Sequence, residues 1–279
     1  MDKMKAYVDT HLKSLAVKRV VDAFNRYSPS YIQIVNNVQS ADLVLVHING
    51  RVESNTRYIN HINKPYAVIQ YAFESTQKPD TKDWMHIWNN AELVWSYLYL
   101  EGEFDFYHAP LGADSDVFYP IDGVPKAYAI LTSGPGYLAE SVREVYHATQ
   151  HLGLPMAHLG SYLGKPPIDY FTNITDEELV MLYNRCRSVS GLRRVEGFEL
   201  PAAEGLLCGV RPILFDRTHY RNWYDGLAIF IPETERDQIV IDVENVLRQG
   251  VEPVTNKEIA ESKERFNWND LIKEFWSYV

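Results

Sequence analysis

The stretch EGFELPAAEGLLCGVRPI, residues 196–213 of the 279-residue chain, is the most informative part of the sequence. It predicts a tight loop, a helix and a strand, because Pro201 suits the first turn of a helix, Gly209 suits its end and Pro212 suits the start of the strand. The amides of residues 197–199 then lie at a helix N-terminus. The partial positive charge there favours an anion or a polyhydroxyl ligand.

Strands and helices alternate on both sides of this stretch, and a turn-rich segment at residues 120–125 divides them into two series. Such alternation favours two α/β domains of the Rossmann type, each with a parallel sheet covered by helices on both faces. Ligands bind such sheets beyond the carboxyl ends of the strands, so we expect the site in a cleft between the domains. The predicted strands are 5–8, 31–35, 43–48, 66–72, 93–96, 128–132, 156–160 and 212–215, and the predicted helices are 12–27, 55–62, 84–92, 138–150, 175–185 and 202–207.

Composition and charge exclude several classes of protein. With 46% hydrophobic and 23% charged residues the chain is globular, and its net charge of −10 gives no overall attraction to nucleic acid or anionic lipid. No apolar run reaches the roughly 20 residues that span a bilayer, and the start lacks the apolar core of a secretion signal, so a cytoplasmic location is expected. The cysteines, Cys186 and Cys208, fall in segments predicted as helices and are expected to be buried thiols.

Residues 196–213 closely resemble the signature of the retaining GT-B fold glycosyltransferases, the large family of glycogen synthase-like, mannosyl- and glucosyltransferases. Glu196 and Glu204 have the E-x7-E spacing of that family. The alternative interpretation makes both glutamates ordinary solvated acids at a helix start.

Two further segments resemble the family in the order that the family has them. Residues 108–120, HAPLGADSDVFYP, resemble the segment that closes the N-terminal domain, and residues 266–268 with Tyr278 resemble the terminal helix that crosses back over it. The resemblance therefore covers most of residues 64–279. It implies an acceptor-side domain at 1–122, a nucleotide-sugar-binding domain at 123–262 and a terminal helix at 263–279, with the two parallel sheets facing each other across the cleft.

The resemblance implies transfer of a hexose or pentose from a UDP- or GDP-linked donor, with retention of anomeric configuration and without a metal or a cofactor. Glu196 would face the donor sugar, where a carboxylate can stabilise oxocarbenium-like charge, and Glu204 would hold the ribose hydroxyls. The implied binding residues for the sugar and the diphosphate are Gly197, Phe198, Glu199 and Leu200.

The cations that usually neutralise the diphosphate are missing from this sequence. Family members carry an arginine and a lysine after the first strand of the second domain, where this chain has LTSGPGY at residues 131–137. Ser133 and Gly134 would present amides to phosphate at that position, or form a plain strand-to-helix loop. The candidate substitute cations are Lys165, Arg193 and Arg194.

The first domain departs from the family as well. Its glycine-rich turn after the first strand is replaced by DTHL at residues 9–12, and Tyr71 stands where a histidine is common. Polar residues at these strand ends are candidates for binding the acceptor or the donor, and each has a structural role as its alternative. These candidates are Thr10, His11, His47, Tyr71 and Glu74.

Two other functions and several acceptors stay open. A noncatalytic GT-B protein that binds a nucleotide or a sugar would explain the missing cations, and the acceptor is a saccharide, a lipid-linked saccharide or, as in viral DNA-base glycosyltransferases, a nucleic acid base. A nicotinamide-dependent enzyme is disfavoured because no G-x-G-x-x-G follows the first strand. The histidines lack metal-ligand spacing, and Trp84, Trp88 and Trp95 are expected in the interior.

Overall fold

The computed structural model describes residues 3–12, 14–73, 81–134, 141–161, 167–194 and 198–279. The chain divides into two compact units. The first comprises Met1–Gly112, Val195–Phe198 and Asn267–Val279, and the second comprises Ala113–Arg194 and Glu199–Phe266. Each unit holds one six-stranded sheet with parallel pairing throughout the described strands, which confirms the predicted α/β class.

The sheet of the first unit has the strand order β2-β1-β3-β4-β5-β6. The chain moves outward in one direction from β1 to β2 and in the other from β3 to β4, so the topology reverses between β1 and β3. In open parallel sheets the carboxyl ends at such a reversal form the ligand crevice. The strands are β1 (Met4–Val8), β2 (Ile32–Ile34), β3 (Leu43–Gly50), β4 (Tyr66–Phe73), β5 (Val94–Ser96) and β6 (Phe106–His108).

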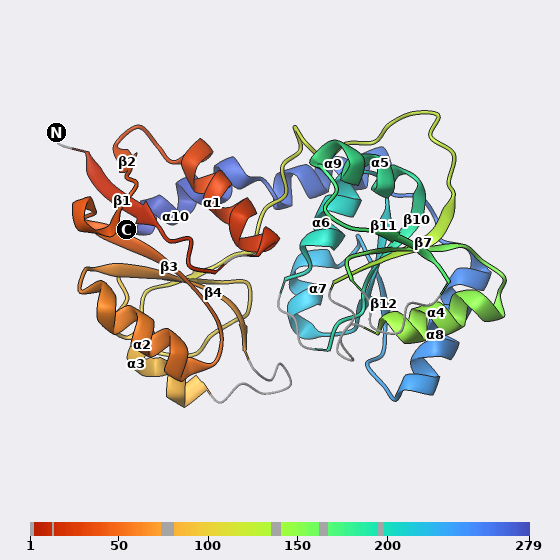
Figure 1. Ribbon diagram of the computed structural model, residues 1–279, viewed down its shortest axis with the longest axis horizontal. Helices are drawn as coiled ribbons and strands as arrows, with labels where there is room; N and C mark the ends of the chain where they lie inside the picture. The colour runs from red at the N-terminus through yellow and green to blue at the C-terminus, as the bar shows by residue number, and fades with distance from the viewer. Residues whose placement is uncertain (1–2, 13, 74–80, 135–140, 162–166, 195–197) are drawn as a thin grey trace. The chain divides into compact units, whose positions relative to one another are not determined.

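Helices cover both faces of this sheet, with α1 and α10 on one face and α2 and α3 on the other (Figure 1). The apolar run at the start of β3 is fully buried for this reason. The ring of Phe24 on α1 lies 5.2 Å from that of Phe275 on α10 at 83°, an edge-to-face contact that fixes the C-terminal helix on the first unit. The helices are α1 (Leu15–Tyr27), α2 (Val52–Ile62), α3 (Met85–Trp88) and α10 (Trp268–Tyr278).

The sheet of the second unit has the order β12-β11-β10-β7-β8-β9, and its topology reverses between β7 and β10. Because parallel crossovers are right-handed, the helix after β7 and the helix after β10 lie on opposite faces. Accordingly α4 packs against α8, and α6 packs against α9 (Figure 1). The strands are β7 (Tyr128–Ser133), β8 (Met156–Leu159), β9 (Asp169–Phe171), β10 (Cys186–Gly191), β11 (Arg211–Phe215) and β12 (Ile229–Ile231).

The remaining helices of the second unit are α4 (Val142–His151), α5 (Asp176–Asn184), α6 (Leu200–Leu207), α7 (Thr218–Tyr224), α8 (Arg236–Gln249) and α9 (Asn256–Arg265). The start of α5 is confirmed: the Thr175 hydroxyl and the Glu178 carboxylate form the predicted capping box. The side chain of Asn184 donates to Tyr119 O at 3.0 Å and accepts from Ile121 N at 2.7 Å. These bonds hold the turn-rich segment to the second unit.

Several local predictions were wrong or incomplete. Cys186 does not lie in a helix but begins β10, although both cysteines are buried and free as expected. The helix predicted at 84–92 is only Met85–Trp88, preceded by a 3₁₀ turn. The three tryptophans are buried, which confirms their interior placement. Within the described residues, no helix has both the length and the apolar character needed to cross a bilayer.

Candidate functional site

The carboxyl ends of β7 and β10 meet at the topological reversal of the second unit. Ser133 ends β7, and Arg193 follows β10 by two residues. The Arg193 guanidinium donates from Nη2 to the Ser133 hydroxyl at 2.8 Å and to the Ser133 carbonyl at 3.2 Å. Gly134 follows with a φ of 115°, in the region that favours glycine. Arg193 therefore brings a positive charge to the strand end whose own sequence lacks one.

Glu199 closes the other side of this arrangement at the start of α6. Its carboxylate is completely buried, and Oε2 lies 3.5 Å from Arg193 Nε. The Tyr220 hydroxyl donates to Glu199 Oε1 at 3.3 Å, and the Tyr224 hydroxyl donates to the Glu199 carbonyl at 2.8 Å. The side chain of Glu199 thus belongs to a buried ion pair that ties the first turn of α6 to the end of β10. The sequence analysis predicted ligand binding by the backbone amide of Glu199 and not by its side chain.

Glu204 lies further along α6 and is only 5% exposed. Its Oε2 accepts a hydrogen bond of 3.0 Å from the Tyr183 hydroxyl. The interpretation of Glu204 as a solvated helix-start acid is therefore wrong. The sequence carries a signal for this burial, because apolar residues surround Glu204 on every side of α6 and a helix that is apolar all round is buried.

The structure describes two of the three candidate cations, Arg193 and Arg194. Arg194 turns toward the loop before α8, where Nη2 donates to Thr234 O at 2.7 Å and Nη1 lies 3.7 Å from Glu233. Arg193 contacts Ser133 at the end of β7. Leu200 and Phe198 are buried beside the loop. Glu196, Gly197, Lys165 and Glu74 lie outside the described residues.

Polar side chains also gather at the reversal of the first unit, where β1 and β3 end side by side. The carboxylate of Asp9, directly after β1, accepts from the His11 backbone amide at 3.2 Å and contacts His11 Nδ1. The His11 ring stacks on Tyr58 of α2 with centroids 4.0 Å apart. Burial raises the pKa of the Tyr58 hydroxyl, and its hydrogen bond to Asp9 raises it further. Asp9 is 3% exposed at its side chain and His11 25%, so the ring is the part that a ligand can reach.

His47 of β3 and Tyr71 of β4 form the second part of this group. His47 Nδ1 lies 2.9 Å from the Tyr71 hydroxyl; His47 is buried and Tyr71 is half-buried. Burial lowers the pKa of His47 to about 4, with Asp9 opposing the shift and His11 adding to it. Burial also raises the pKa of Tyr71. Both groups are consequently neutral at pH 7, and Asp9 and His11 lie close enough to influence His47.

The sequence predicted part of this group and missed the rest. The structure brings together His11, His47 and Tyr71 from three strand ends. Asp9 was missed, although its place as the first polar residue after β1 was a usable signal. Tyr58 was missed because nothing in the helix pattern of α2 shows that it faces His11. Thr10 instead lines an apolar groove of about 430 Å³ along α1.

The arrangement of possible metal ligands is defined only in the part of the chain that the structure describes. Among the residues that the structure describes, no three histidine, cysteine, aspartate or glutamate side chains are arranged to hold a metal ion. The cationic group at the end of β7 and the polar group at the end of β1 are therefore the two candidate sites for chemistry.

The fold of the chain is similar to those of several solved structures. It matches a sucrose-phosphate synthase from Thermosynechococcus elongatus with a TM-score of 0.72 and 12% identity, over 99% of this chain and 98% of that one. It matches HepE from Anabaena in complex with UDP-glucose with a TM-score of 0.70 and 12% identity, over 99% and 100% of the two chains.

A third match is AviGT4, a glycosyltransferase involved in avilamycin A biosynthesis, with a TM-score of 0.67 and 10% identity over 99% and 96% of the chains. Neither the protein-family models nor the curated sequences gave a match. Likeness at this level of identity, along the full length of both chains, establishes that the chain has the GT-B fold.

Proposed function

We propose that the chain is a glycosyltransferase that moves a sugar from a nucleoside diphosphate donor, UDP-linked in the first instance, to an acceptor hydroxyl. The observation that carries this proposal is the match of the whole chain to the whole of HepE, a protein solved with UDP and with UDP-glucose.

On the donor side, Arg193 is the cation that we assign to the diphosphate. Its guanidinium lies against Ser133 at the end of β7, the position where the sequence lacks the usual arginine and lysine. The amides at the start of α6 add a second source of positive potential. A planar guanidinium suits phosphate because it offers parallel donors, and no metal is then required.

Glu196 and Glu204 complete the proposed donor site. We assign Glu204 to the ribose hydroxyls and Glu196 to the sugar, following their E-x7-E spacing. The burial of Glu204 and its hydrogen bond from the Tyr183 hydroxyl hold the carboxylate in one place, which supports a specific role. By the same resemblance we propose that transfer retains the anomeric configuration.

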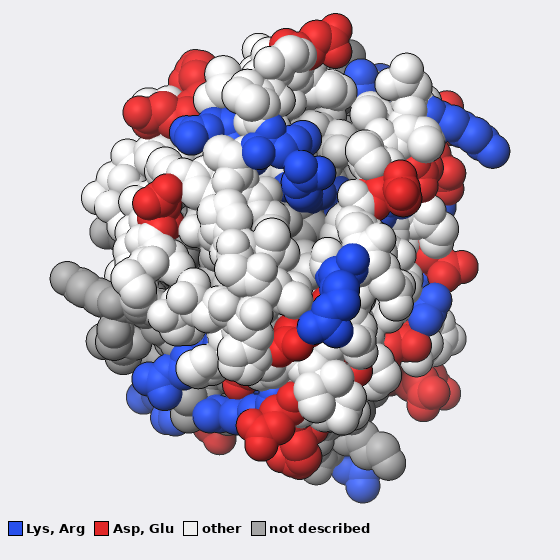
Figure 2. All heavy atoms as spheres, turned by 90° about the vertical axis from the view of Figure 1, so that its right-hand side faces the viewer, with Lys and Arg blue, Asp and Glu red and all other residues white. Residues whose placement is uncertain are grey.

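On the acceptor side, we assign the polar group at the end of β1. Asp9 and Tyr58 fix the exposed His11 ring, which supports hydrogen bonding of His11 to an acceptor hydroxyl. A saccharide acceptor is favoured over a nucleic acid base. The net charge of −10 gives no overall attraction to nucleic acid. On the one face drawn in Figure 2, lysine and arginine side chains lie among aspartate and glutamate side chains.

The test is release of nucleoside diphosphate from a panel of UDP- and GDP-sugars, with and without saccharide acceptors. We expect acceptor-dependent release that Glu196→Gln lowers at the level of kcat while nucleotide affinity is nearly unchanged. Asp116→Asn, an exposed carboxylate outside both groups, serves as the control. Tight nucleotide binding without release from any donor would overturn the proposal and indicate a noncatalytic binding protein.

A further inference from the structure

The second unit contains a cavity of about 630 Å³ at the amino ends of its strands. The candidate donor site lies at their carboxyl ends. Lys126 and Ala127 precede β7, Pro155 precedes β8 and Arg187 is the second residue of β10, so all of them lie at amino ends of strands. Ser133 and Arg193 lie at the carboxyl ends of the same two strands, β7 and β10. A six-residue strand is about 20 Å long, so the two sites are separate.

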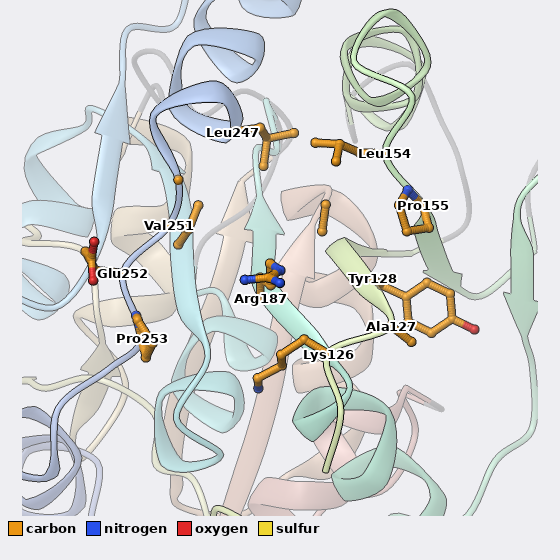
Figure 3. Close-up of a pocket in the computed structure, with 12 residues that line it drawn as sticks. Lys126, Ala127, Tyr128, Leu154, Pro155, Arg187, Leu247, Val251, Glu252 and Pro253 are labelled. Carbon is orange, nitrogen blue, oxygen red and sulfur yellow. The ribbon is translucent and has the colours of Figure 1, made fainter. Parts of the chain in front are cut away.

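Two cations, Lys126 and Arg187, line this cavity, and both are exposed at the surface. Figure 3 shows Arg187 in the middle of the pocket and Lys126 directly beneath it, with Leu247 and Leu154 above. Neither cation forms a hydrogen bond or an ion pair with any residue that the structure describes. Other arginines of this unit do pair with carboxylates, as Arg211 does with Glu258 at 2.6 Å and Arg217 with Glu233 at 2.8 Å.

The environment opposes two positive charges here. Partial desolvation lowers the pKa of the Lys126 ammonium. Cys186 and Cys208 oppose this shift, and the Arg187 guanidinium adds to it. Glu252 lines the pocket without an ion pair to either cation. Tyr128 on the wall is already engaged, donating to Asp169 at 2.5 Å. An acidic chain with abundant carboxylates thus leaves its two adjacent cations without one, and a bound anion would relieve their repulsion.

The other residues that line the cavity indicate which chemical group a ligand would carry besides its anion. Leu154, Leu247, Val251 and Pro253 supply apolar walls around the two charges. The volume lies in the usual range for small-molecule sites and exceeds what a free inorganic anion fills. Two neighbouring cations suit a ligand group with two negative charges, such as a phosphate, better than a carboxylate with one. A competing explanation for the two cations is that the partial negative charge at the nearby C-terminus of α8 attracts both of them. This explanation predicts no ligand.

We propose that this pocket binds a small organic phosphate, with the phosphoryl group between Lys126 and Arg187 and the organic part against Leu154, Leu247 and Val251. The site does not depend on the proposed function, because it uses the opposite edge of the sheet and none of the donor residues.

Calorimetric titration of the full chain with phenyl phosphate, inorganic phosphate and phenol tests the proposal. We expect phenyl phosphate to bind more tightly than inorganic phosphate, and phenol not to bind. Lys126→Ala and Arg187→Ala should each weaken phenyl phosphate by about tenfold or more, the usual effect of losing a charge-assisted hydrogen bond. Lys263→Ala, which removes one exposed positive charge from α9 of the same unit, should leave the affinity unchanged.

Three results would overturn the proposal: no binding of phenyl phosphate at millimolar concentration, equal affinity in both pocket variants and the wild type, or full competition between phenyl phosphate and UDP. The last result would place the phosphate at the donor site. Failure of UDP to bind would count against the proposed function and leave this test intact. Melting of each unliganded variant checks its folding, and Arg187→Gln replaces any alanine variant that fails to fold.

Discussion

Replacing Arg193 with alanine removes the side chain that joins β7, β10 and α6 in the second unit. Arg193 is 13% exposed and its partner Glu199 is completely buried, with 3.5 Å between Nε and Oε2. Without the guanidinium, the Glu199 carboxylate loses this compensating charge, and Ser133 loses the hydrogen bonds to its hydroxyl and carbonyl. Breaking a buried ion pair on one side costs about 3–5 kcal/mol.

We expect Arg193→Ala to lower the free energy of unfolding by that amount, measured by urea and thermal denaturation. At about 2–4 °C per kcal/mol for a unit of this size, the melting midpoint should fall by about 6–20 °C. The double variant Arg193→Ala with Glu199→Gln should recover about 1–3 kcal/mol, because the uncompensated charge is then removed. Tyr220→Phe, which removes only the 3.3 Å hydrogen bond to Glu199, should cost about 1 kcal/mol.

The reasoning is refuted if Arg193→Ala costs less than about 1 kcal/mol, the value of an exposed pair. It is equally refuted if adding Glu199→Gln destabilises the Arg193→Ala variant further. Either result would mean that the carboxylate does not depend on Arg193.

Three further predictions concern the two sites. Glu204→Ala should weaken binding of UDP by about 1.5–3 kcal/mol in calorimetry, whereas Tyr183→Phe should keep most of the affinity, and equal UDP affinity in all three proteins would defeat the ribose assignment. The pKa of His47 is about 4 in the folded chain against 6.5 ordinarily, so the unfolded state takes up the proton first. Stability should therefore fall by about 3 kcal/mol as the pH drops from about 6.5 to about 4, and His47→Gln should remove that loss, which pH-dependent urea unfolding measures. Burial also lowers the pKa of His219 to about 4. His219 lies in the second unit, so the pH dependence of stability in its variant serves as the comparison. Transfer activity should survive excess EDTA; loss with EDTA and recovery with Mg²⁺ would contradict the role given to Arg193.

The sequence predicted those parts of the fold that depend on local physics. The strand predicted at 43–48 and the capping box of Thr175 and Glu178 are set by neighbouring residues. Both were confirmed, the strand as Leu43–Gly50. In contrast, β10 was missed because its buried positions hold small polar residues. Ser188 is fully buried, and its hydroxyl donates to Ala129 O at 2.8 Å, so the strand satisfies its polarity through the neighbouring strand. Strands of three residues, such as Phe106–His108, are too short to show a period.

The sequence predicted several individual residues of the candidate sites. It did not predict which of these residues contact one another. The strand ends were correctly expected to carry polar side chains, including Ser133 and His11. Which of them meet depends on strand order: Arg193 reaches Ser133, 60 positions away, only because β10 lies beside β7. In the same way Tyr58 meets His11 only because α2 packs over the sheet beside the end of β1.

The most direct measurement of the central claim is NMR of the full chain incubated with UDP-glucose, GDP-mannose and related donors in the presence of saccharide acceptors. The proposed function predicts free nucleoside diphosphate together with a glycoside whose anomeric configuration matches that of the donor. A glycoside of inverted configuration would contradict retention and would point to His11, held by Asp9, as the base for the acceptor hydroxyl. Absence of any glycoside with every donor and acceptor would contradict the claim that the chain is a glycosyltransferase.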